Sequence, residues 1–253
     1  MSRLSVITPS FNLMRYLPET VASVAKLESP HEHLIVDAAS TDGTVDFLKS
    51  IEDPDVRWIS EPDRGQAHAM NKGIAMSEGD LIGWLNADDT YVEDAVDRSV
   101  AYLDEHPEVD AVYGWMEIVD GDGGLVETYR CGGFDWRRFL YLGDYIPTPS
   151  IIFRKRLLNE RIPGLDESYL DSSDYDFYLR LLKGRNVQLM REPLVRFRYY
   201  EGSKTELNVR LRREAHDIRL KWARGPRDVA VMNLANRLQN LRNRVLKPWP
   251  ETD

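Results

Sequence analysis

Short runs of β-branched and apolar residues alternate with stretches of helical periodicity over the first hundred residues, and this alternation constrains the fold more than any other feature. Strand, helix, strand at this spacing is typical of βαβ units, whose strands pair in parallel. Pro9 is expected to end the first strand. The expected strands are 4–8, 33–37, 56–60 and 81–85, and the expected helices are 17–27, 44–51, 67–76 and 92–105.

The loops that follow these strands are where a ligand is expected, because ligands of parallel sheets bind beyond the carboxyl ends of the strands. The rule selects three loops, at 9–12, 37–43 and 86–90. We therefore expect these loops to form one site.

The second half of the chain has a different pattern. The segment Asp120-Gly-Asp-Gly-Gly124 predicts a hairpin turn between two strands. From about residue 205 the chain becomes rich in arginine and helical in pattern. The expected strands of this half are 111–119, 125–129, 150–153 and 194–199, with a helix at 175–182.

The charge distribution separates the end of the chain from the rest. The formal net charge is −9, which argues against nucleic acid as a partner, since duplex binding favours a basic surface. Residues 203–247 carry 12 Lys and Arg against 4 Asp and Glu. This basic segment predicts a distinct extension.

Cysteine content and hydropathy bear on the compartment. Cys131 is the single cysteine, which excludes an internal disulfide and fits a reducing compartment. No stretch approaches the roughly 18 apolar residues that span a bilayer. We expect a cytoplasmic protein that is at most peripheral on the inner face of the plasma membrane.

Two adjacent carboxylates, Asp88 and Asp89, follow the fourth expected strand. One or two carboxylates together with substrate phosphates are the usual ligands of Mg²⁺ or Mn²⁺ on a diphosphate. The alternative is that the pair only caps the helix that begins near Val92.

Small polar residues follow the first two strands, in Val6-Ile-Thr-Pro-Ser-Phe-Asn12 and in the loop after Asp37. Such loops suit a nucleobase and a ribose, and Asp37 can accept hydrogen bonds from either. Capping of the next helix by Ser40, Thr41 and Asp42 is compatible with that role.

Two further features carry less weight alone. Arg64 and Lys72 flank a glycine at the start of a helix, which suits an anion, although both residue types are more often solvated. Asp174 begins an expected helix, where a carboxylate can deprotonate an acceptor hydroxyl. The alternative for Asp174 is an N-cap, with Asp176 in the first turn.

Taken together, these segments resemble the family 2 glycosyltransferases, inverting enzymes of the GT-A fold, over about residues 4–205. The matching motifs are S-V-I-T-P-S-F-N (5–12), V-D-x-x-S-T-D-G-T (36–44), S-E-P-D-x-G-x-x-x-A-x-N-K-G (60–73), E-G-D-x-I-x-W-L-N-A-D-D (78–89), D-x-D-F-Y-L-R-L (174–181) and F-R-x-x-x-G-S-K-T (197–205).

The resemblance implies an α/β fold with a Rossmann-like, mostly parallel sheet flanked by helices. It implies a GT-A domain over 1–204, with a nucleotide-binding half at about 1–110 and an acceptor half at about 111–204. A basic helical extension, 205–253, would follow this domain.

The resemblance also implies the site residues. Asp174 would be the catalytic base, and Asp88 would bind a divalent metal, Mn or Mg, with Asp89 as a second candidate. Residues of the acceptor side would be Pro149, Ser150 and Asp171. The nucleotide-sugar would contact Thr8, Pro9, Ser10, Asn12, Asp37, Asp63, Arg64, Asn71, Asn86 and Ala87.

Three positions depart from the family pattern. Asn86 stands where the DxD-type motif begins with Asp, and Tyr200 stands where many members carry a His, which leaves a third metal ligand open. Ala38 replaces a second acid that often follows Asp37, which leaves the donor base open among UDP-, GDP- and dTDP-sugars. The Q-x-x-R-W motif of processive synthases is missing, which favours a single addition.

The predicted function is transfer of a sugar, with inversion, from a nucleotide diphosphate to a glycan or lipid-linked acceptor. The setting would be polysaccharide, lipopolysaccharide or glycolipid synthesis. The alternatives are a catalytically silent nucleotide-sugar-binding relative and a nucleotidyltransferase, although Thr8-Pro-Ser-Phe-Asn12 lacks the Gly and basic residues that a triphosphate loop needs.

The extension has two interpretations. Leu207, Leu211, Ile218 and Trp222 can share a helical face among basic residues, which suits peripheral contact with an anionic membrane. The other interpretation is a helix packed on the domain or on the second subunit of a homodimer.

Overall fold

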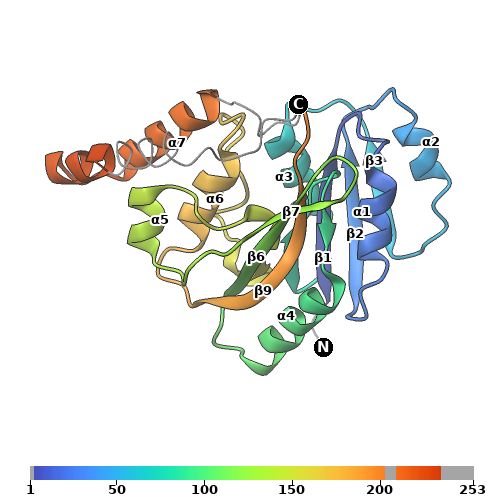
Figure 1. Cartoon of the computed structure of the whole chain (residues 1–253), viewed down its shortest axis with the longest axis horizontal. Coiled ribbons are helices and arrows are strands. Elements are labelled where there is room, and N and C mark those ends of the chain that lie inside the picture. The colour runs from blue at the N-terminus through green and yellow to red at the C-terminus, as the bar shows by residue number, and fades with distance from the viewer. Residues whose placement is uncertain (1–2, 203–208, 235–253) are drawn as a thin grey trace.

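A single nine-stranded sheet forms the centre of the computed structural model, which describes residues 3–202 and 209–234 (Figure 1). The strand order is β3-β2-β1-β4-β8-β6-β9-β5, and β7 pairs with β6 outside this path. The pairs β3-β2, β2-β1, β1-β4 and β6-β9 are parallel, and the others are antiparallel. The strands are β1 (Leu4–Ser10), β2 (His31–Asp37), β3 (Val56–Ser60), β4 (Leu81–Trp84), β5 (Thr90–Tyr91), β6 (Ala111–Val119), β7 (Leu125–Tyr129), β8 (Ile152–Arg154) and β9 (Val187–Arg198).

Helices cover both faces of this sheet. Side chains alternate between the two faces along each strand, so apolar residues of one strand pack against helices on both sides. Leu4 and Val6 of β1 lie in one apolar cluster with Val96 and Val100 of α4, whereas Ile7 lies in another cluster on the opposite face. The expected α/β architecture, with a mostly parallel central sheet flanked by helices, is therefore confirmed. The helices are α1 (Leu17–Val24), α2 (Thr44–Lys49), α3 (Gln66–Met76), α4 (Glu93–Glu105), α5 (Trp136–Leu142), α6 (Ser173–Leu181) and α7 (Val209–Trp222), with 3-10 turns η1 (Thr148–Ser150) and η2 (Lys155–Leu157).

Gly73 allows α3 to approach β1 closely. A Cβ atom at this position would lie 2.3 Å from Ile7 Cγ2, far inside van der Waals contact. Any larger residue would therefore push α3 away from the strand whose carboxyl end carries the first site loop.

The prediction that Pro9 ends the first strand was wrong, because β1 continues to Ser10. The Ser10 carbonyl accepts from Ala38 N on the β2 side, and the Ile7 carbonyl accepts from Leu85 N on the β4 side. Pro9 therefore faces the β4 side, where β4 has already ended at Trp84. Its missing N–H costs no hydrogen bond there.

The antiparallel half departs further from the prediction. β9 begins at Val187 rather than Leu194, and Pro193 lies where the β6–β9 register shifts, an irregularity that tolerates proline. Ser150 belongs to η1 rather than to a strand. The helix α5 was not predicted, although Asp135 caps it by accepting from Arg138 N at 2.6 Å.

The described part of the C-terminal extension packs on the domain, beside α5 and α6 (Figure 1). Ile218 is fully buried, and the Trp222 ring lies 5.3 Å from that of Trp136. Ile218 and Trp222 belong to the helical face that was expected to meet a membrane, but in the structure they pack against the core. Leu207 of the same face and the expected domain boundary near residue 204 lie outside the described residues. In the described ranges no helix is long and apolar enough to cross a bilayer.

Candidate nucleotide-sugar site

The loops after β1 and β2 are joined by hydrogen bonds at the carboxyl edge of the sheet. Asn12 adopts a left-handed backbone, with φ of 52°. Its nitrogen donates to Ser40 Oγ at 2.7 Å, and its side-chain oxygen accepts from Thr41 N at 2.9 Å. Asp42 accepts from Met14 N across the same gap. These hydrogen bonds therefore join the two loops to each other.

Asp37 lies beneath these loops and is fully buried. Its carboxylate accepts from Ser40 N at 3.0 Å, from Ser40 Oγ at 2.5 Å and from Ser60 Oγ at 2.6 Å. These bonds occupy the carboxylate, so Asp37 shapes the loop that would hold a nucleotide.

The side chains at the end of β1 differ in exposure and in hydrogen bonding. Phe11 is 59% exposed, and the sequence interpretation did not select it. Ser10 is buried, and its hydroxyl has no hydrogen-bond partner within the described part of the chain. Thr8 is also buried, and its Oγ1 lies 2.8 Å from His33 Nε2. An exposed aromatic ring next to a buried, unsatisfied hydroxyl is an arrangement that a bound base and sugar can complete.

The Asn86–Asp89 loop follows β4 and gives the two acids different surroundings. Asp89 is fully buried, and its oxygens accept from Arg198 N at 3.0 Å and from Asn86 Nδ2 at 2.8 Å. Asn86 Oδ1 in turn accepts from Trp84 Nε1 and Gln66 Nε2, both at 3.0 Å. Asn86 and Asp89 therefore fix the loop from below.

Asp88 is the half-buried acid of this pair. Its Oδ2 accepts from the Tyr200 hydroxyl at 3.0 Å. Burial raises the pKa of Asp88, and burial together with the Asp88 charge raises the pKa of Asp89 well above its usual value. A cation beside Asp88 would relieve this cost of desolvation.

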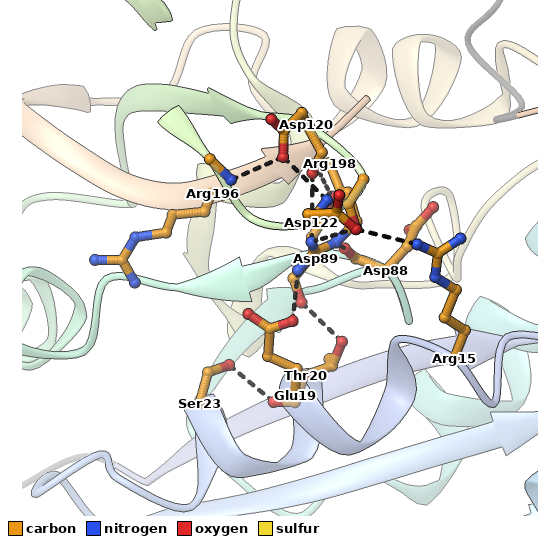
Figure 2. A network of polar contacts seen from close by, with 12 residues as sticks. Arg15, Glu19, Thr20, Ser23, Asp88, Asp89, Asp120, Asp122, Arg196 and Arg198 are labelled. Carbon is orange, nitrogen blue, oxygen red and sulfur yellow. Dashed lines mark hydrogen bonds and ion pairs between the residues drawn. The ribbon is translucent and has the colours of Figure 1, made fainter. Parts of the chain in front are cut away.

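Arg198 of β9 connects the loop to two other segments, helix α1 and the β6–β7 turn, as Figure 2 shows. Its guanidinium is almost fully buried and donates to the Asp88 carbonyl at 3.1 Å and to Glu19 Oε2 at 2.6 Å. It also donates to the carbonyls of Asp120 and Gly121 in the β6–β7 turn. Arg198 lies in the motif F-R-x-x-x-G-S-K-T, but no role was predicted for it from the sequence.

Helix α1 supports the same loop from the other side (Figure 2). Thr20 Oγ1 lies 2.9 Å from the Ala87 carbonyl and 2.8 Å from that of Asp89. Ala87 is fully buried, so its contribution comes through its backbone.

These residues fit a divalent cation held by one carboxylate and by substrate phosphates. Within 3–202 and 209–234, no three His, Cys, Asp or Glu side chains are grouped to hold a metal ion. Mg²⁺ and Mn²⁺ sites on nucleotides commonly take most ligands from phosphate and water. Asp88 supplies the one protein carboxylate that such a site needs.

The residues before and within α3 make contacts with other parts of the protein, although Arg64 itself is exposed. Asp63 accepts from Gly65 N at 2.8 Å, and Arg64 pairs with Glu167 at 2.6 Å. The Asn71 amide donates to the Leu165 carbonyl at 3.0 Å and accepts from Leu165 N at 2.8 Å. Asn71 therefore joins α3 to the segment that precedes α6.

Asp174 lies in the first turn of α6, where the sequence placed it. Its Oδ2 accepts from Thr148 Oγ1 at 3.0 Å. Pro149 and Ser150 follow Thr148 and are buried, with Ser150 Oγ donating to the Pro147 carbonyl at 2.8 Å. Their place on the acceptor side stays a prediction, and Thr148 of the same turn contacts Asp174.

Asp171 does not face the acceptor side freely, because its buried carboxylate pairs with Arg210 of α7. Glu214 of α7 accepts from three backbone nitrogens of the same segment, those of Leu170, Asp171 and Ser172, at 2.8–3.2 Å. The segment before Asp174 is therefore held by the C-terminal helix, a contact that no short-range pattern indicates.

The structure has an α/β fold whose parallel strands bring the loops after β1, β2 and β4 to one edge of the sheet. The model of the family "Glycosyl transferase family 2" matches residues 5–162, and the chain belongs to this family. It is a glycosyltransferase.

Two relatives show the range of the family. An uncharacterised glycosyltransferase of Mycobacterium tuberculosis (strain CDC 1551 / Oshkosh) is 34% identical over 183 residues, which cover 70% of this chain and 68% of the relative. A putative teichuronic acid biosynthesis glycosyltransferase of Bacillus subtilis (strain 168) is 38% identical over 106 residues, which cover 40% and 42% of the two chains.

Two solved structures share the GT-A fold. TarS 1–349 of S. aureus, in complex with UDP-GlcNAc, has a TM-score of 0.70 at 20% identity, over 85% of this chain and 64% of that one. The mannosyltransferase PcManGT of Pyrobaculum calidifontis, in complex with GDP-Man and Mn²⁺, has a TM-score of 0.64 at 19% identity, over 93% and 69%. This chain spans less than two thirds of that TarS chain.

Proposed function

We propose that this chain transfers a sugar from a nucleotide diphosphate-sugar to an acceptor hydroxyl with inversion at the anomeric carbon. One observation carries the proposal. The loop after β4 is fixed by Asn86, Asp89 and Arg198, and it leaves Asp88 as a half-buried carboxylate at the end of β4, the strand that pairs with β1.

The donor nucleotide is proposed to bind at the β1 and β2 loops. The exposed ring of Phe11 offers a stacking surface for the base, and the Ser10 hydroxyl offers a hydrogen bond to base or ribose. Asp37 acts by holding the loop. TarS and PcManGT with their bound UDP-GlcNAc and GDP-Man support a nucleotide-sugar donor, and they leave UDP, GDP and dTDP as candidate nucleotides.

A divalent cation, Mn²⁺ or Mg²⁺, is proposed to join Asp88 to the diphosphate. When bound, it would neutralise charge that develops on the leaving nucleoside diphosphate. The Mn²⁺ bound in PcManGT supports this cofactor. Asn86 and Asp89 would keep Asp88 in place.

Asp174 is proposed to be the general base. Tyr175 N in the first turn of α6 donates to Asp174 Oδ1 at 2.8 Å, and the positive end of a helix dipole favours the ionised form of a carboxylate there. The ionised oxygen takes the proton of the acceptor hydroxyl while that hydroxyl attacks the anomeric carbon and the bond to the diphosphate breaks. A single displacement of this kind inverts the configuration and needs no covalent nucleophile.

The acceptor is proposed to be a glycan or a lipid-linked sugar. The relative assigned to teichuronic acid biosynthesis supports a role in polysaccharide or glycolipid synthesis. Peripheral membrane contact and dimer formation would depend on the outer face of the C-terminal helices, because Ile218 and Trp222 are used in packing.

A panel of UDP-, GDP- and dTDP-sugars tests the function. Thermal stabilisation with and without Mn²⁺ identifies the nucleotide, since stabilisation grows with ligand concentration over Kd. Release of nucleoside diphosphate then measures turnover. A silent relative would bind without turnover, a nucleotidyltransferase would prefer nucleoside triphosphates, and a chain that binds no member of the panel would contradict the proposal.

A further inference from the structure

A second carboxylate lies close to the proposed base. Asp144 follows α5 and is far from Asp174 in sequence, yet both reach the same hydroxyl. Thr148 Oγ1 is 3.0 Å from Asp174 Oδ2 and 3.4 Å from Asp144 Oδ2. The Thr148 hydroxyl therefore lies between the two carboxylates.

A single hydroxyl carries one proton and can donate to only one of these acceptors at a time. If both carboxylates were ionised, one would lack this donor and two like charges would share a small region, which is unfavourable. One proton held by the pair removes both problems. Asp144 O–H then donates to Thr148 Oγ1, and Thr148 donates to Asp174.

The surroundings determine which acid keeps the proton. Asp144 is an exposed residue, and the protein around its carboxylate removes only part of its water. This desolvation, together with the negative charge of Asp174, raises the pKa of Asp144 well above its usual value. Asp174 lies at a helix start, which favours its ionised form.

We propose that Asp144 is a positioning residue for the base, because it orients the Thr148 hydroxyl, which in turn fixes the ionised carboxylate of Asp174. This inference rests on the proposed role of Asp174. It adds Asp144 and Thr148 to the acceptor side, where neither was selected from the sequence.

Four variants test the chain of hydrogen bonds. Thr148→Val and Asp144→Ala remove a link, so the turnover rate of each should fall about tenfold, the usual effect of one oriented hydrogen bond. Thr148→Ser restores the hydroxyl and Asp144→Asn restores a neutral donor, so both should recover most of that loss. The probe is release of nucleoside diphosphate from UDP-GlcNAc or GDP-mannose, with water in place of the acceptor.

Controls separate positioning from folding. Affinity for UDP or GDP with Mn²⁺ and the thermal midpoint should stay unchanged in all four variants, because the donor loops lie on other strands. Glu127→Gln, an exposed acid on β7, is the matched change of a distant carboxylate.

Two results would overturn the inference. If Asp144→Asn is as impaired as Asp144→Ala, Asp144 acts as an ion and not as a neutral donor. If Thr148→Val keeps the wild-type turnover rate, the Thr148 hydroxyl does not connect Asp144 to the base. Asp174→Asn, measured in parallel, distinguishes these from failure of the proposed function. If Asp174→Asn stays active while Asp144→Asn does not, the base itself has been misassigned.

Discussion

The Tyr200 hydroxyl donates to Asp88 Oδ2 at 3.0 Å, so the carboxylate proposed to hold the metal already has a protein partner. The Tyr16 and Tyr200 rings pack together at 4.9 Å, which holds the phenol in this position. Tyr200 can stabilise Asp88, but unlike a histidine it provides no nitrogen ligand.

Tyr200→His should therefore strengthen Mn²⁺-dependent binding of the nucleoside diphosphate, by about tenfold, since imidazole is a good ligand for divalent transition metals. Tyr200→Phe is the matched control, because it removes the hydroxyl and adds no ligand. Calorimetry with Mn²⁺ measures both. Equal affinities in the two variants would argue that position 200 lies too far from the metal.

Asp88→Asn should weaken nucleotide binding in Mn²⁺ by at least about tenfold while the fold stays intact. The change keeps the shape of the side chain and removes the charge that attracts the cation. Asp122→Asn, an exposed acid of the β6–β7 turn, is the control. Mn²⁺-dependent affinity that survives in Asp88→Asn would exclude Asp88 as the metal ligand.

Asp174→Asn should lower transfer by about 10²–10⁴-fold with little change in donor affinity, because general-base assistance is lost. Asp176→Asn should mainly lower stability, since buried Asp176 pairs with Arg180 at 2.7 Å. Asp166→Asn is an exposed control. Near-normal transfer in Asp174→Asn, with loss in an Asp176→Asn protein that still folds and binds donor, would reverse the assignment.

Glu214→Ala should slow transfer and leave donor binding unchanged. The variant removes the acceptor of three backbone N–H groups just before α6, so the segment that carries Asp174 should lose order. Hydrogen exchange over 170–176 should accelerate. Asp217→Ala, an exposed position on α7, should change neither property. Transfer at the normal rate despite faster exchange would show that the base does not need α7.

The stability of the fold should decrease in acid because of His33. Burial, with a smaller effect of His31, lowers the pKa of His33 to about 3. Below pH of about 6.5 the unfolded chain therefore binds a proton that the folded chain cannot, and the free energy of unfolding falls by up to about 1.4 kcal/mol per pH unit toward pH 3. The contribution is constant above that window.

Urea unfolding at pH 7, 5 and 4 measures this dependence. His33→Gln should flatten it, whereas His106→Gln, at a half-buried position, should not. A slope in His33→Gln equal to that of the wild type would assign the acid sensitivity to other groups.

Local sequence determined the parallel half of the fold and the order of its loops. Strand β3 has the predicted bounds, as do β6 and β7 of the antiparallel half, because runs of β-branched and aromatic residues and a glycine-rich turn are local signals. The loops after β1, β2 and β4 were selected from the same pattern, because parallel strands bring their carboxyl ends to one edge.

Only the tertiary structure decided what each polar residue of these loops does. Asp88 and Asp89 are adjacent residues of the same type. The backbone N–H of Arg198, 109 residues after Asp89, donates to the Asp89 carboxylate, whereas Asp88 stays half-buried. Asp144 and Asp174 likewise meet only through Thr148, and Glu214 reaches α6 only because α7 packs beside it. A short-range pattern encodes periodicity and capping, whereas the burial and hydrogen-bond partners of a carboxylate depend on segments that are far apart in the chain.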